Sequence, residues 1–245
     1  MPWHGGVEIL STGDEVRSGA VVDSNAAWIA ERLESAGAPV LRHTCVGDDR
    51  DGIAAALTEI AARAGSAVVP RARGPTADAR NAEAAALAAG VHLAESPAAL
   101  GVVERFLAPR GIPISAANRK QALVPAGAEV FDNPEGSAPG FRVRIAGCQV
   151  VCLPGVPHEM QAMLERHVMP RLGELTGRPA DLQRVAAIQT FGLPESIVGE
   201  RLQGLEEAYP GLRVGLRLMF PEIQVRLYGR DPEARALEEL LARST

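Results

Sequence analysis

Three short apolar runs, separated by amphipathic helical segments, constrain the fold of this chain more than any other feature of its sequence. The runs at 7–10, 40–46 and 67–69 have the length and composition of buried strands, and helical periodicity occupies 23–37 and 51–61 between them. Connections of this length give parallel strands with right-handed crossovers rather than hairpins. We therefore expect an α/β domain whose doubly wound, mainly parallel sheet is covered by helices on both faces.

The chain continues with helical patterns over 79–89 and near 97–108, followed by a loop-rich stretch from 113 to 140. Residues 141–153 alternate between apolar and polar side chains as a hairpin does. A helix of about four turns is predicted after the motif LPGVPHEM at 153–160.

A change of pattern at ELTGRPAD, residues 174–181, marks a boundary between a first domain, 1–174, and a second, 175–245. The second domain is predicted to be a small β-α-β-β-α unit. Its elements are a strand at 185–191, a helix from Pro194, strands at 212–218 and 223–228, and a final helix from Pro232.

Charge and composition argue against several kinds of partner. The formal net charge is −5 and no basic patch stands out, so no nucleic-acid partner is expected. No apolar run approaches the ~18 residues of a membrane span, and the N-terminus MPWHGGVEILSTG lacks the pattern of a signal peptide. We therefore expect a cytoplasmic protein without a membrane partner. The cysteines fit no zinc signature and are expected to be buried free thiols: Cys45, Cys148 and Cys152.

The loops that follow the three predicted strands converge, because the carboxyl ends of parallel strands meet at one edge of a sheet. These loops read STGDE, VGDD and PRARGPTAD. Asp14, Asp23, Asp48 and Asp78 all fall at this edge, where carboxylates could hold Mg²⁺ against a phosphate. The alternative is that each one is a turn former or a helix N-cap, which aspartate favours anyway.

Three later stretches carry further candidate groups. NRKQA at 118–122 puts two cations and two amides into a predicted loop, and a solvated charge pair is the alternative reading. SAPGF at 137–141 is a turn whose glycine allows close approach of a ligand. LPGVP at 153–157 is rigid and places Glu159 in the first turn of a helix, where the helix dipole alone also accounts for it.

The order of these short motifs is more informative than any one of them. In turn, the chain contains GDEVRSG, DSNA, VGDD, GPTAD, NRKQA, GSAPGF and LPGVPHEM. In that order they resemble the competence/damage-inducible protein CinA family, in its molybdopterin-binding-like domain, over about residues 6–172. FGLPES at 191–196 extends the resemblance into the small second domain. Longer relatives add a domain that deamidates nicotinamide mononucleotide, for which we expect no room in these 245 residues.

The resemblance implies the fold of molybdenum-cofactor biosynthesis proteins, a homodimer, and metal-dependent hydrolysis of ADP-ribose. It implies Mg²⁺, Mn²⁺ or Co²⁺ as the cofactor, Asp48 and Asp78 as the metal-binding and catalytic residues, and a small phosphate ligand of the ADP-ribose or pterin type. The ligand-binding residues that it implies are Gly13, Asp14, Asn25, Gly47, Gly74, Pro75, Thr76, Asn118, Lys120, Gln121, Ser137, Ala138, Pro139, Gly140, Pro154, Gly155 and Glu159.

The third loop departs from the family pattern, which reads approximately T-G-G-L-G-P-T-x-D-D. Here Pro70, Arg71, Ala72 and Arg73 replace the first four letters, and Ala79 replaces the second aspartate. A glycine pair lets backbone N–H groups surround a phosphate, which Arg71 and Ala72 cannot do without backbone strain. Pro70 also removes a backbone donor.

Three hypotheses follow from this departure. In the first, a nucleotide or pterin-phosphate site persists, but its loop Pro70–Ala79 is degenerate, so that hydrolysis is weak or absent and no cofactor is required. In the second, Arg71 and Arg73 contact the phosphate through their side chains, and the chain is an active metal-dependent ADP-ribose pyrophosphatase. In the third, the chain is a non-catalytic molybdopterin-binding or assembly protein.

Overall fold

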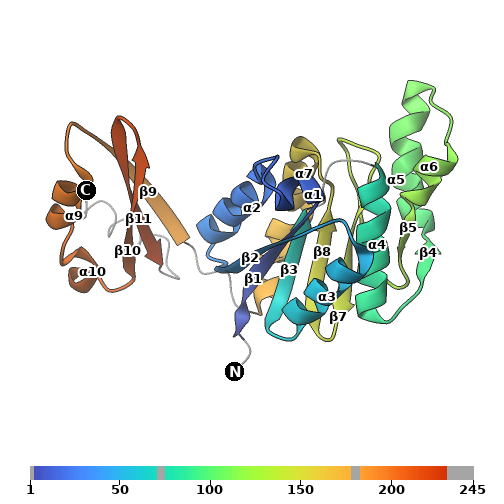
Figure 1. Ribbon diagram of the computed structural model, residues 1–245, viewed down its shortest axis with the longest axis horizontal. Helices are drawn as coiled ribbons and strands as arrows, with labels where there is room; N and C mark the ends of the chain where they lie inside the picture. The colour runs from blue at the N-terminus through green and yellow to red at the C-terminus, as the bar shows by residue number, and fades with distance from the viewer. Residues whose placement is uncertain (1–2, 71–74, 178–182, 231–245) are drawn as a thin grey trace. The chain divides into compact units, whose positions relative to one another are not determined.

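The computed structural model of the protein describes residues 3–70, 75–177 and 183–230, which belong to two compact units (Figure 1). The first unit contains residues 1–33 and 38–178, and the second contains residues 179–245 together with 34–37. Among the described residues, no helix is long and apolar enough to cross a membrane.

A six-stranded sheet of order β2-β1-β3-β8-β7-β6 forms the centre of the first unit (Figure 1). Strands β2, β1, β3 and β8 are parallel, and β7 and β6 complete the sheet in antiparallel pairing. The predicted mainly parallel α/β sheet is thus confirmed. The strands are β1 (Trp3–Thr12), β2 (Val40–Val46), β3 (Ala64–Pro70), β6 (Glu129–Phe131), β7 (Gly140–Ile145) and β8 (Cys148–Leu153).

Helices cover this sheet on both faces because β2 and β3 lie on opposite sides of β1. Right-handed crossovers in opposite directions place α2 (Ser24–Ser35) on one face and α3 (Arg50–Ala61) on the other. Helix α4 (Pro75–Ala89) packs beside α3, and a continuous apolar cluster joins these two helices to the sheet. The remaining helices of the unit are α1 (Asp14–Arg17), α5 (Pro97–Leu107), α6 (Ala116–Lys120), α7 (Pro157–Met163) and α8 (Leu172–Thr176).

The stretch from 113 to 140 contains more regular structure than its sequence predicts. Residues 118–120, expected in a loop, belong to helix α6. Strand β5 (Leu123–Pro125) pairs with β4 (Leu93–Glu95) in a separate two-stranded sheet. These elements contain only three to five residues each, too few for periodicity to reveal them.

Two further expectations need correction. The helix expected over 51–61 begins one residue earlier, at Arg50, and its N-cap is Asp49, whose side chain accepts from the Gly52 N–H. The long helix expected after LPGVPHEM is interrupted, because α7 passes at Leu164 into a π-helical turn and then a 3₁₀ turn before α8.

The cysteine expectation holds for two of the three thiols. Cys148 and Cys152 are buried thiols of β8 that form no disulfide, whereas the thiol of Cys45 in β2 is exposed. Burial raises the pKa of the Cys148 thiol to about 12. That thiol therefore stays protonated at neutral pH and contributes to the core as an apolar group.

The second unit contains a three-stranded antiparallel sheet of order β10-β11-β9. Its strands are β9 (Gln183–Phe191), β10 (Leu212–Met219) and β11 (Glu222–Arg230), and its helices are α9 (Glu195–Arg201) and α10 (Leu205–Ala208). Alternate strand residues such as Val225 and Leu227 pack against Val198 of α9 on one face. This matches the predicted β-α-β-β order, while the final helix expected from Pro232 lies outside the described residues.

Candidate functional site

The strand ends that precede the loops expected to converge lie at one edge of the six-stranded sheet. Strands β1, β2, β3 and β8 end there, and antiparallel β7 begins there at Gly140. A cavity of about 180 Å³ lies at this edge, between the ends of β1 and β3 and the start of α2. It is lined by Ser11, Thr12, Glu15, Val16, Val21, Val22, Asp23, Ser24, Asn25, Pro70 and Gly155.

The loops after β1 and β2 contact each other closely. The Gly13 N–H donates to the carbonyl of Val46 at 3.0 Å. A Cβ at Gly47 would lie 2.5 Å from Asp14 Oδ1, so a side chain at this position would displace the Asp14 carboxylate. The Asp14 carboxylate is paired with Arg17 at 3.3 Å, a local contact that accounts for it without a ligand.

Two buried or half-buried amides hold the walls of the cavity in place. Asn25 Nδ2 donates to the carbonyl of Gly155 at 2.9 Å, which joins α2 to the loop after β8. Asn81 Nδ2 donates to Thr12 Oγ1 at 3.0 Å, which joins α4 to the end of β1. Both bonds connect segments far apart in the chain, so the cavity is formed before any ligand arrives.

A second set of polar contacts positions the loop before β7. Asn133 is buried, and its Nδ2 donates to the carbonyl of Ala138 at 2.9 Å and to Glu159 Oε2 at 2.7 Å. A Cβ at Gly136 would collide with the same carboxylate. Glu159, proposed from the sequence as a ligand contact, therefore anchors the loop that carries Ser137–Gly140.

The third loop is only partly described. Pro70 ends β3, pairs with Leu153 of β8 and lines the cavity. Arg71–Gly74, which include both loop arginines, lie outside the described residues. Pro75, Thr76 and Asp78 belong to the first turn of α4, but their side chains are outside the description. The degenerate-loop prediction thus stays a prediction.

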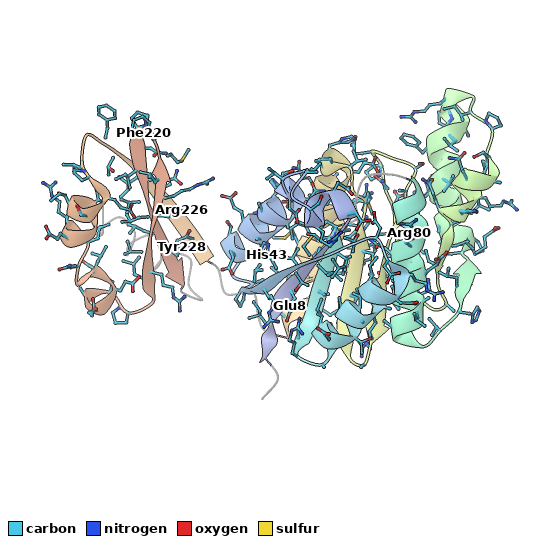
Figure 2. All side chains as sticks on the ribbon, in the orientation of Figure 1. Glu8, His43, Arg80, Phe220, Arg226 and Tyr228 are labelled. Atoms are coloured by element: carbon cyan, nitrogen blue, oxygen red, sulfur yellow. The ribbon has the colours of Figure 1, made fainter. Side chains whose placement is uncertain are left out.

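Arg80 is a described cation at the start of α4 (Figure 2). Its side chain is exposed and donates to the backbone carbonyl of Asp48 at 3.3 Å. It therefore bridges the third loop's helix and the loop after β2, where an anionic group of a ligand could reach it.

Residues Asn118, Lys120 and Gln121, expected to bind the ligand, lie in or at the end of helix α6 and do not line the cavity. Asn118 forms a capping box with Ser115 at the start of α6, and its Oδ1 accepts from the Ser115 hydroxyl at 2.6 Å. Lys120 is exposed at the end of the same helix, which packs against α5. The described contacts of Asn118 are structural, and they do not join it to the cavity.

The residues present do not by themselves form a metal centre in the described part of the chain. Among the side chains that the structure describes, those of residues 6–70, 80–177 and 186–229, no three His, Cys, Asp or Glu groups converge on one point. Asp48 would need Asp78 as its partner, and the side chain of Asp78 is not among those described. We therefore assign no reaction step to a metal.

Sequence reasoning missed three of the side chains that build the site. Asn81, Asn133 and Arg80 belong to no motif quoted above, and nothing in a single sequence distinguishes them from surface polar residues. Thr12 lies in the STGDE loop, but no role was predicted for its side chain.

Comparison with known proteins places the first unit in a family. A family model described as a probable molybdopterin binding domain matches residues 8–174. A crystal structure of the protein CinA with unknown function from Thermoplasma acidophilum is similar, with a TM-score of 0.61 and 29% identity. That match covers 70% of this chain and 98% of the other.

Two curated relatives extend the similarity over nearly the whole chain. A CinA-like protein of Desulfosudis oleivorans is 46% identical over 233 residues, which are 95% of this chain and 56% of the relative. A CinA-like protein of Escherichia coli strain SE11 is 40% identical over 234 residues, 96% of this chain and 58% of the relative. The chain thus spans a little over half the length of the relatives it matches.

Proposed function

This chain belongs to the probable molybdopterin binding domain family and is similar to CinA-like proteins. On that premise we propose that its first unit binds a phosphate-bearing nucleotide or pterin. We propose further that it hydrolyses this ligand weakly or not at all. The ligand lies at the carboxyl edge of the sheet, in and beside the cavity between β1 and β3. The names of the relatives identify a family but no activity. The proposed activity therefore rests on the residues of the site.

The position of the cavity is the observation that supports this proposal most. The connection from β1 leads to β2 on one side of it, and the next connection passes back across β1 to β3 on its other side. The two crossovers therefore run in opposite directions, and they diverge between β1 and β3. A crevice forms at such a point in doubly wound sheets, and ligands bind there. Thr12 and Pro70, at the two strand ends, both line the cavity.

The expectation of weak hydrolysis rests on Pro70, the residue at the end of β3 that lines the cavity. In the family pattern, a threonine hydroxyl stands where this chain has Pro70, which offers neither a hydroxyl nor an N–H. Preorganised donors are usually the largest source of stabilisation for developing negative charge, and losing one costs about 10²-fold or more in rate. Ala79 stands where the family pattern has a second aspartate, and the loss of that carboxylate should lower the rate of hydrolysis further.

The experiment is a binding and turnover assay on the full chain. ADP-ribose should bind in calorimetry, and with Mg²⁺, Mn²⁺ or Co²⁺ its hydrolysis should stay far below that of relatives that carry the family loop. Turnover equal to those relatives would contradict the proposal. Binding of a molybdopterin without binding of ADP-ribose would favour the non-catalytic hypothesis.

The arginine-assisted alternative is separated from this proposal by one substitution. If Arg71 supplies the phosphate contact, Arg71→Ala should abolish the activity that remains; under our proposal it should leave that activity unchanged or raise it. Arg144→Ala is the matched control, because Arg144 is exposed at the opposite edge of the same sheet.

A further inference from the structure

The charged side chains that line the cavity are carboxylates, and none of its described side chains is a cation that could pair with a phosphate. The described residues that line it include Glu15 and Asp23, and they include no lysine or arginine. Two carboxylates repel a phosphate, because all three groups carry negative charge at neutral pH.

The neutral polar groups of the wall can also accept hydrogen bonds. The hydroxyls of Ser11, Thr12 and Ser24 accept as well as donate. Asn25 Nδ2 uses one of its two hydrogens in the bond to Gly155, and its Oδ1 is an acceptor. Asp23 Oδ1 accepts from the Ala26 N–H at 3.0 Å, and its second oxygen remains as a further acceptor. Pro70 contributes no N–H. Ligand groups that donate hydrogen bonds therefore fit this wall best.

The rest of the wall is apolar. Val16, Val21 and Val22 line the cavity, and Val22 is 85% exposed, so it forms part of the mouth. A flat ring or the carbon face of a sugar would cover these valines and remove apolar surface from water.

The carboxylates of Asp23 and Glu15 also act on the neighbouring thiol of Cys45. Burial and then the charge of Asp23 raise the pKa of Cys45, with a smaller contribution from Glu15, while Arg17 opposes them.

From these contacts we propose that the cavity binds the uncharged, donor-bearing part of the ligand, and that the phosphate lies outside it. This inference rests on the proposed function, because it assigns one part of that ligand. Two groups have the required chemistry: the hydroxyls of a ribose, and the amino and ring N–H groups of a pterin. Both donate to carboxylates and present an apolar face.

Calorimetry on the full chain tests this assignment with phosphate-free and phosphate-only probes. The probes are adenosine, 6-hydroxymethylpterin and inorganic pyrophosphate, each with and without Mg²⁺. The variants are Glu15→Gln and Asp23→Asn, which remove charge and keep size, and asparagine also keeps the N-cap acceptor for Ala26. Glu104→Gln, at an exposed position on α5, is the control.

We expect adenosine or the pterin to bind, and whichever binds identifies the ligand class. Its Kd should rise roughly tenfold in each variant, as for a lost hydrogen bond to a charged group, while the control leaves it unchanged. Pyrophosphate should bind equally well or better in both variants. Failure of both neutral probes, or pyrophosphate binding that needs Mg²⁺ and is lost in both variants, would overturn the assignment.

Failure of this inference can be told apart from failure of the proposed function. ADP-ribose that binds the wild type and both variants equally overturns the cavity assignment alone. If the chain binds adenosine or the pterin through these carboxylates but does not bind ADP-ribose, only the proposal that its ligand bears a phosphate is contradicted.

Discussion

Glu8 lies in the middle of β1 with its carboxylate held by one guanidinium (Figure 2). Its side chain is 3% exposed, and Arg63 donates to it through Nε at 2.7 Å and Nη2 at 2.9 Å. Charge at such a position requires a partner, because an isolated buried carboxylate is strongly unfavourable. The sequence shows neither residue as special, since only the register of β1 beside the end of α3 brings them together.

Arg63→Ala should lower the free energy of unfolding by about 3 kcal/mol, because it leaves the Glu8 carboxylate buried without its partner. Urea denaturation measures this. Arg42→Ala is the matched control, since Arg42 is exposed and pairs in register with Glu8 in the neighbouring strand; its effect should stay below about 0.5 kcal/mol. Equal losses in the two variants would contradict this role of Arg63.

At the scale of elements, the strands that carry the site could be predicted, and the short elements around it could not. Strands β1, β2 and β3 follow from apolar runs bounded by turn residues, and their shared edge follows from parallel pairing. Helix α6 escaped prediction because its start depends on Ser115 and Asn118, whose capping contacts are invisible without coordinates. The same limit hid Asn133, whose amide holds the loop before β7.

Gly136→Ala tests the contact between that loop and helix α7. The added methyl would displace the Glu159 carboxylate and break its bond to Asn133, so the free energy of unfolding should fall by about 2 kcal/mol. In a Glu159→Ala background the same substitution should cost much less, because the obstructing group is gone. Additive losses in this double-mutant cycle would show that the two residues are not coupled.

Asn118→Ala tests whether this residue of α6 binds the ligand or only caps its helix. As a capping residue it should lower the free energy of unfolding by about 1 kcal/mol and leave ADP-ribose affinity unchanged. Ser115→Ala, which removes the other half of the capping box, should behave in the same way. A large loss of affinity in Asn118→Ala alone would return it to the ligand-binding residues.

At the scale of the whole molecule, we propose that the six-stranded sheet still carries the binding site while the catalytic loop after β3 has lost its function. The fold, its cavity and the contacts that hold the cavity depend on residues that are present, such as Thr12, Asn25 and Asn81. The departure that the sequence predicts from the family pattern lies within residues 70–79. Binding and hydrolysis can therefore be lost separately.

The family resemblance also predicts a homodimer, which is a property of the whole chain. Light scattering coupled to gel filtration should give twice the chain mass of 25.8 kDa. A mass equal to one chain, unchanged with dilution, would contradict this expectation.

Restoring the family loop tests the central claim most directly. The variant carries Pro70→Thr, Arg71→Gly, Ala72→Gly, Arg73→Leu and Ala79→Asp together, and its hydrolysis of ADP-ribose with Mg²⁺, Mn²⁺ or Co²⁺ is measured beside the wild type. The degenerate-loop account predicts a gain of at least roughly 10²-fold in turnover, the contribution of a preorganised donor set. A folded variant that binds ADP-ribose and shows no gain, or a wild type already as active as that variant, would contradict the account.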